Sequence, residues 1–289
     1  MRAEIRRRAV GSATRIVTAL GLDFDRGVVL SDSNSLVVRL LPCDIVARIA
    51  PETHQVARLE VDLARGLSRV GAPVAGPDPR IDPGPHADDG FVITLWTHYP
   101  TASQPVSAAS YAQALRQVHA GMRTLDVAVP HFTERVHRAE YLTAHRHETP
   151  DLADDDRALL AETLRRTREQ VQARHPVEQL LHGEPHPGNL LATASGPRFI
   201  DFETACRGPV EFDLAHAPEE AAALYPGADP ELLAACRLLS LAVVTTWRWE
   251  RTDQLPDGRR LAREWLQRIR STVDADGGPE VGAPPTSPP

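Results

Sequence analysis

The sequence predicts an α+β fold in which a small antiparallel sheet precedes a mostly helical remainder of the chain. Three β-like runs, at residues 28–30, 36–41 and 45–49, are separated only by short polar turns. From residue 107 to residue 273, outside one central loop region, apolar residues recur at helical spacing. A group of strands followed by a run of helices is typical of the α+β class.

The composition is that of a folded protein without a membrane segment. Of the 289 residues, 42% are hydrophobic, which is enough to bury a sizeable core. The longest apolar stretch, residues 238–247, is bounded by Arg237 and Arg248, and the basic N-terminus lacks the apolar core of a signal peptide. Three widely spaced cysteines favour neither a disulfide framework nor a metal knuckle. We therefore expect a cytoplasmic protein with no membrane partner.

The charged residues narrow the choice of partners and of chemistry. All 32 basic residues are Arg, and the chain contains no Lys. This excludes Schiff-base chemistry and a P-loop, both of which need a lysine. The Arg residues are scattered and the net charge is −7, so a nucleic-acid partner is not expected. An acidic protein is better suited to a cationic substrate.

The order of the predicted elements follows from local patterns. A weak helical pattern covers residues 1–20, and a strong one covers 52–70 and stops at Gly71. A loop rich in Pro, Gly and Asp, residues 76–90, leads to an apolar strand at 91–96. Further helices are predicted at 107–122, 132–147, 154–173, 230–250 and 258–273. The tail at 276–289 has no apolar pattern, and we expect it to be disordered.

The stretch from residue 180 to residue 215 carries the strongest functional signal. Glu184 lies among Gly and Pro residues that prevent a helix, and Asn189 follows five residues later. Leu190 and Leu191 begin a short strand, residues 196–197 are predicted as a turn, and a second strand ends at Asp201. The pattern predicts a loop followed by a hairpin.

Phosphoryl transfer to a hydroxyl group needs this set of side chains. One carboxylate accepts the hydroxyl proton, and further oxygen ligands hold magnesium against the phosphates. Glu184, Asn189 and Asp201 supply these groups in the same order and with the same five-residue interval that protein kinases use. Each residue alone could be a turn or capping residue. Five ordered matches over the stretch favour the kinase interpretation.

A zinc site is the alternative interpretation of the same stretch. His182 and His186 are four residues apart, as in the metal-binding helix of some proteases. That spacing aligns two histidines only on a helix, and the intervening Gly and Pro residues prevent one. The metalloprotease interpretation is therefore disfavoured.

The sequence HGEPHPGN at 182–189, together with Gly208 and the Asp-Leu-Ala at 213–215, resembles the aminoglycoside phosphotransferase and choline kinase family. That family has Asp where this chain has Glu184. The resemblance implies a two-lobed protein-kinase-like fold with ATP and Mg²⁺ in the cleft. It implies a small antiparallel-sheet N-terminal lobe at residues 1–98 and a mostly helical C-terminal lobe at 99–275, which carries the catalytic loop and the acceptor pocket. It also implies that Asp213 braces the catalytic loop.

The resemblance assigns nucleotide-binding roles in the small lobe. Arg48 stands where kinases carry the lysine of the third strand, and its fork is expected to hold phosphate oxygens bidentately. Glu60, on the flank of the apolar helix face, is expected to pair with Arg48, and Glu52 is the competing partner. For each of these charges, a solvated surface position is the alternative.

Three further positions complete the predicted nucleotide and metal site. Asn34, in the polar connection at 31–35, is expected to donate to the phosphates, unless this connection is only a hairpin turn. Backbone groups from Trp96 to His98 are expected to bind adenine. Glu203 is a weaker candidate than Asp201 for assisting the metal.

The predicted function is transfer of the γ-phosphoryl group of ATP, with magnesium, to a hydroxyl group. The acceptor is expected to be a small cationic molecule, such as an aminoglycoside-like antibiotic or an aminoalcohol. The alternative is a nucleotide-binding pseudokinase with a regulatory role, because both Arg48 and Glu184 depart from the residue types expected at functional positions.

Overall fold

The structure, a computed structural model, describes residues 3–32, 35–53 and 55–276. The chain divides into two compact units, Met1–Pro130 with Glu178–Gly227 and His131–Val177 with Ala228–Pro289. The expected lobe boundary near residue 98 therefore lies inside the first unit, and the expected tail lies outside the described residues apart from its first position. The first unit contains every residue of the predicted site that the structure describes.

The first unit is built on a five-stranded antiparallel sheet with the order β1-β2-β3-β5-β4. Its strands are β1 (Phe24–Asp32), β2 (Leu36–Pro42), β3 (Ile45–Pro51), β4 (His86–Asp88) and β5 (Phe91–Thr97). The predictions of four of these strands are confirmed. β4 was expected to be loop, and it forms because its three residues pair with β5.

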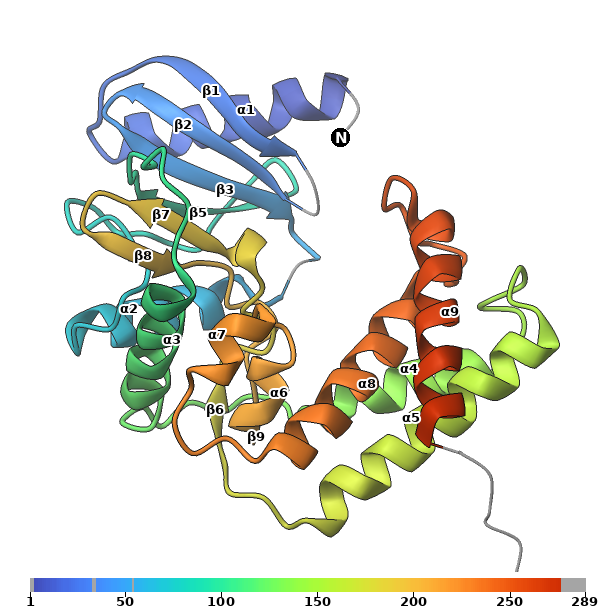
Figure 1. Ribbon diagram of the computed structural model, residues 1–289. Coiled ribbons are helices and arrows are strands. Elements are labelled where there is room, and N and C mark those ends of the chain that lie inside the picture. The colour runs from blue at the N-terminus through green and yellow to red at the C-terminus, as the bar shows by residue number, and fades with distance from the viewer. Residues whose placement is uncertain (1–2, 33–34, 54, 277–289) are drawn as a thin grey trace, which may run out of the picture. The chain divides into compact units, whose positions relative to one another are not determined.

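The alternation of side chains in the sheet separates a core face from a site face. Every second residue of the central strands packs against helix α1 (Ala3–Ala19), which lies along the sheet in Figure 1. In β3 these buried residues are Ile45, Ala47 and Ile49. Because neighbouring residues of a strand point to opposite faces, Val46 and Arg48 point to the other side. That side lines the cavity described below.

Two helices of the first unit were also predicted. α2 (Ala57–Arg69) begins five residues later than expected, because the residues just before it are in turns. α3 (Ala108–Met122) starts at the expected place, where the Ser107 side chain accepts a hydrogen bond from the Ser110 N–H. A cap of this kind satisfies a donor that the first helical turn leaves without a partner.

The central stretch forms the predicted loop and hairpin with one difference in register. β7 (Leu190–Thr193) pairs with β8 (Gly196–Phe199), so that Ala192 lies opposite Pro197. The turn is therefore at residues 194–195, and the prediction of a turn at 196–197 is wrong by two residues. Pro197 is accommodated because both strands of a two-stranded sheet are edge strands.

Several short elements next to the hairpin were not predicted. β6 (Glu178–Leu181) pairs with β9 (Cys206–Pro209), and α6 (Val210–Leu214) and α7 (Glu219–Ala223) follow. The 3₁₀ turn Pro187–Asn189 precedes β7. The pairing of Leu181 with Cys206 brings the 182–184 loop close to the start of α6. This proximity is what allows Asp213 to reach the loop.

The second unit is helical, as predicted, with α4 (Thr133–Ala144), α5 (Asp154–Ala173), α8 (Pro230–Trp247) and α9 (Gly258–Asp276). Among the described helices, α8 is the one whose length and composition would allow it to cross a membrane. Core helices of soluble proteins meet the same criteria, and α8 packs against α4, α5 and α9 with Leu239 and Ala242 fully buried.

Candidate active site

The loop at residues 182–184 is held in a conformation that only glycine tolerates. Gly183 has φ of +89°, and a Cβ atom placed there would lie 1.9 Å from the backbone oxygen of Thr204. Both the positive φ and the close approach exclude a side chain at this position. Glu184 therefore follows a backbone turn that is tightly packed against the 201–205 segment.

Asp213 fixes the backbone of this loop through hydrogen bonds. Its carboxylate is fully buried and accepts hydrogen bonds from the N–H groups of His182 (2.9 Å) and Gly183 (2.7 Å) and from His119 Nε2 (2.9 Å). Burial alone would raise the pKa of Asp213, but these donors hold it below its ordinary value. The ionised carboxylate thus braces the loop as expected.

His182 is a structural residue of the loop. Its ring is fully buried, with Nε2 donating to the carbonyl of Ile200 (3.0 Å) and Nδ1 accepting from the Glu184 N–H (3.4 Å). Burial lowers the pKa of His182 in spite of the nearby Asp213. A neutral ring with both nitrogens in hydrogen bonds is unsuited to binding a metal, so the zinc alternative has no support at this position.

The segment from Glu184 to Asn189 is a compact turn. The Glu184 carbonyl accepts from the N–H of His186 (2.8 Å) and from the side-chain amide of Asn189 (3.0 Å). The hydroxyl of Tyr111 donates to the carbonyl of Pro185. Glu184, whose side chain is the predicted base, is half-buried. The fixed backbone determines the position of the Glu184 Cα atom, from which this side chain extends.

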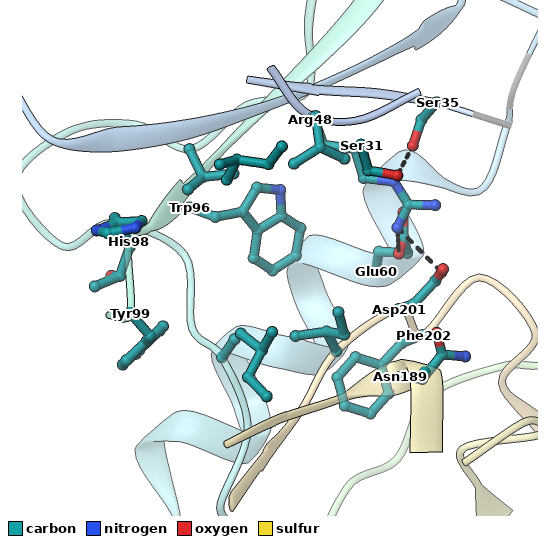
Figure 2. A pocket seen from close by; sticks show the side chains of 18 of the residues that line it. Ser31, Ser35, Arg48, Glu60, Trp96, His98, Tyr99, Asn189, Asp201 and Phe202 are labelled. Carbon is teal, nitrogen blue, oxygen red and sulfur yellow. Dashed lines mark hydrogen bonds and ion pairs between the residues drawn. The ribbon is translucent and has the colours of Figure 1, made fainter. Parts of the chain in front are cut away.

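Arg48 lies at the centre of a group of acidic side chains (Figure 2). Its Nη1 is 2.5 Å from Glu60 and 3.1 Å from Asp201, and its Nη2 is 2.7 Å from Glu203. Its Nε donates to the hydroxyl of Ser35 (3.1 Å). Burial alone would lower the pKa of Arg48, but the three carboxylates raise it above its ordinary value. The predicted pairing with Glu60, rather than with Glu52, is confirmed.

The expected bidentate contact of Arg48 with phosphate does not fit this arrangement. Four of the five N–H groups of a guanidinium correspond to the four hydrogen bonds just described. Carboxylates thus occupy both Nη1 and Nη2, so the two nitrogens are not available together for a phosphate group. The sequence showed the cation at position 48 but not the number of acids that surround it.

A cavity of about 600 Å³ lies beneath the sheet in the first unit. Its walls combine apolar side chains with the polar groups of the predicted site, namely Leu30, Ser31, Ser35, Val37, Val46, Arg48, Glu60, Ala75, Trp96, Thr97, His98, Tyr99, Thr101, Gly188, Asn189, Leu191, Ile200, Asp201 and Phe202. Pockets of this size and mixed lining hold small ligands. Among the described residues, the lining does not include Glu184.

The indole of Trp96 projects into this cavity (Figure 2). Its Nε1 donates to the hydroxyl of Thr94 (2.8 Å), which holds the ring near the sheet. His98 also lines the cavity, as expected for the segment proposed to bind adenine. Asn34 lies outside the described residues, while Ser35 beside it is buried against Arg48.

Asp201 and Asn189 each offer an oxygen of the kind that binds a divalent cation. Both line the cavity and are drawn at the lower right of Figure 2. Because the Asn189 amide nitrogen donates to Glu184, the amide oxygen is the atom left to act as a ligand. Magnesium is commonly bound by one or two such protein oxygens together with phosphate oxygens. Within the described part of the chain, no cluster of three His, Cys, Asp or Glu side chains could hold a metal.

The sheet-covered cavity, the Arg48–Glu60 pair and the braced loop define a protein-kinase-like fold with a phosphotransferase site. The chain belongs to the phosphotransferase enzyme family (APH), whose sequence model matches residues 18–271. It is a small-molecule kinase, and the pseudokinase alternative is not favoured. None of the curated proteins matches the sequence.

Solved structures with the same fold are distant in sequence. An amicoumacin kinase in complex with AMP-PNP and Ca²⁺ is 14% identical with a TM-score of 0.68, covering 94% of this chain and 97% of its own. A choline/ethanolamine kinase family protein from Mesorhizobium loti is 16% identical, with a TM-score of 0.64 and coverages of 91% and 95%. APH(2'')-IIIa with GDP and kanamycin is 14% identical, with a TM-score of 0.64 and coverages of 91% and 97%. The predicted fold class is thereby confirmed.

Sequence reasoning missed two residues that support the loop. Tyr111 and His119 lie in the helix predicted at 107–122, for which the sequence suggested no role in the loop. Both are buried, yet Tyr111 also bonds the Pro185 carbonyl and His119 links Asp213 to the hydroxyl of Tyr225 (2.8 Å). A polar atom on a buried aromatic ring needs a partner, and this is the signal that could have identified them.

Proposed function

We propose that the protein transfers the γ-phosphoryl group of ATP, with magnesium, to a hydroxyl group of a small cationic molecule. The observation that carries the proposal is the common cavity wall formed by Arg48, Asn189 and Asp201 beneath the sheet. The similar amicoumacin kinase was solved with AMP-PNP and Ca²⁺, and APH(2'')-IIIa with GDP and kanamycin. The net charge of −7 favours a cationic acceptor over an anionic one.

Each residue of the proposed site has a separate task. The Asn189 oxygen and the Asp201 carboxylate would hold magnesium, which when bound neutralises charge on the phosphates. Glu184 would orient the acceptor hydroxyl and take its proton. Arg48, held in place by Glu60, would attract the phosphates through its positive charge and not through a bidentate contact. Trp96 and the backbone as far as His98 would form the base site.

Glutamate at position 184 extends further than the aspartate of the related family by one methylene. The close packing at Gly183 and the hydrogen bond from Asn189 fix the backbone from which this longer side chain extends. Glu184→Gln keeps the shape and removes the base, so kcat should fall by about 10²- to 10⁴-fold with little change in nucleotide affinity. Glu184→Asp should keep measurable activity.

The experiment is ADP release from Mg-ATP with a panel of aminoglycosides, aminoalcohols and neutral sugars. Nucleotide binding is followed in parallel by thermal shift with Mg-ATP, and with ATP plus EDTA as the control. Turnover with at least one cationic acceptor is expected, and it should be lost in Glu184→Gln. Binding of Mg-ATP without turnover on any acceptor would contradict the proposal, as would full activity in the Gln variant.

A further inference from the structure

Glu203 reaches Arg48 because of how its neighbours are packed. Phe202 is almost fully buried, with its ring centroid 4.7 Å from that of His182. Asp201, which has φ of +68°, and Glu203 flank this anchor on either side. Both carboxylates converge on the same guanidinium, at 3.1 Å and 2.7 Å. The anchoring of Phe202 thus places two acids, and not one, beside Arg48.

The two arms of the guanidinium have different partners. Nη1 is shared between Glu60 and Asp201, whereas the bond from Nη2 goes to Glu203. A lysine at this position would carry a single nitrogen and could be held by one glutamate. An arginine presents a planar fork whose second arm also needs an acceptor when it is buried. The Arg48 side chain is only 13% exposed, so most of its donors need acceptors from the protein.

The charges around Arg48 indicate what Glu203 could contribute once a metal ion binds. One guanidinium faces three carboxylates, which leaves an excess of two negative charges in the absence of ligand. A divalent cation bound at Asp201 would compete with Arg48 for that carboxylate. Glu60 and Glu203, each on its own arm, would keep Arg48 in place when Asp201 turns to the metal.

We propose that Glu203 is a positioning residue for Arg48, and that Arg48 and Glu203 form a matched pair in which the second carboxylate holds the second arm of the fork. The proposal rests on the function proposed above, because its kinetic consequence is on nucleotide binding. It assigns to Glu203 a task different from binding the metal.

The test is a double-mutant cycle of wild type, Arg48→Lys, Glu203→Gln and the double variant. The affinity for Mg-ATP, the Mg²⁺ concentration for half-maximal binding and the thermal midpoint without ligand are measured for each protein. Glu203→Gln should weaken nucleotide binding about tenfold or more in the wild-type background, because it removes a bond to a charged group. In the Arg48→Lys background the same change should cost less than about twofold. The ligand-free midpoint should show the same coupling.

Two results would overturn the pairing. One is an equal loss from Glu203→Gln in both backgrounds. The other is a loss that appears as a higher Mg²⁺ requirement, which would make Glu203 a metal ligand. If Glu203→Gln does not fold, Glu203→Asp, which keeps the charge and shortens the reach, replaces it with the same expected coupling. If wild type binds no Mg-ATP, the proposed function fails, while the ligand-free midpoints still decide the pairing.

The matched control is an exposed ion pair. Arg165 and Glu169 are 2.8 Å apart on α5, and their side chains are 50% and 53% exposed. Arg165→Lys and Glu169→Gln, alone and together, should leave nucleotide affinity unchanged and show little coupling in the thermal midpoint. Coupling confined to the Arg48 and Glu203 cycle would identify a property of the site and not of ion pairs in general.

Discussion

The turn that presents Glu184 depends on the absence of a side chain at Gly183, and Gly183→Ala tests this directly. A Cβ atom there would lie 1.9 Å from the oxygen and 2.6 Å from the carbon of the Thr204 carbonyl. No real contact is so short, so the loop or the 201–205 segment must move. Since Asp201 and Glu203 lie in that segment, any such movement affects both the proposed base, Glu184, and the proposed metal ligand, Asp201.

The size of the effect follows from two contributions. A non-glycine residue at φ of +89° costs about 1–3 kcal/mol. Relief of the overlap with Thr204 costs about 1–3 kcal/mol more, as for other overpacked sites. The summed loss lowers the thermal midpoint by roughly 10 °C in a domain of this size. A displacement of Glu184 by about 1 Å should reduce kcat about 10²-fold.

Gly227→Ala is the matched control, because Gly227 has φ of +81° and no heavy atom within 4 Å of the added Cβ. It carries the backbone cost without the overlap. Thermal unfolding and ADP release are measured for both variants and wild type. We expect Gly183→Ala to lose more stability than Gly227→Ala. Of the two variants, only Gly183→Ala should lose activity. Equal losses in the two variants would refute the role of the Thr204 contact.

Three further predictions concern the support of the loop. Asp213→Asn replaces a carboxylate that accepts three hydrogen bonds, so the free energy of unfolding measured with urea should fall by about 3–5 kcal/mol. The control Asp155→Asn, at an exposed position, should lower it by about 0.5 kcal/mol or less. Tyr111→Phe leaves the Pro185 carbonyl without its hydroxyl donor and should cost about 1–3 kcal/mol by the same measurement; an unchanged denaturation midpoint would contradict it. Because burial lowers the pKa of His182 below 6.5, the unfolded chain binds a proton that the folded chain does not as the pH falls below 6.5. Stability should therefore fall on acidification by up to about 1.4 kcal/mol per pH unit, and His182→Gln should lose this contribution.

Elements with their own periodicity were predictable, and elements that depend on a partner were not. β3 alternates buried and half-buried residues, and α8 keeps its apolar pattern over its whole length. β6 and β9 have four residues each, and β9 ends in Gly208 and Pro209, which are typical of turns. Their strand conformation comes from pairing with each other, and this pairing joins residues far apart in the sequence.

The same distinction applies to the site. Glu184, Asn189 and Asp201 were predictable because they lie in one stretch whose turn residues exclude a helix. The Arg48–Glu60 pair was predictable because helical spacing places Glu60 on the flank facing the sheet. Glu203 was expected beside the metal, but its ion pair with Arg48 was not predictable, since it depends on the burial of Phe202. No local pattern in the sequence reports that burial.

The arginine at position 48 affects the whole proposed phosphate site and not only one residue in it. A lysine ammonium is a point charge that one glutamate can hold, whereas the guanidinium of Arg48 spreads its donors over two arms and Nε. Ser35, Glu60, Asp201 and Glu203 meet those donors from three separate segments of the sequence. A lysine at position 48 would have one nitrogen in place of the two arms. The carboxylate of Glu203, which now accepts from the second arm, would therefore lose its positive partner. Arg48→Lys should consequently weaken nucleotide binding instead of improving it, even though lysine is the usual residue of kinases at this position.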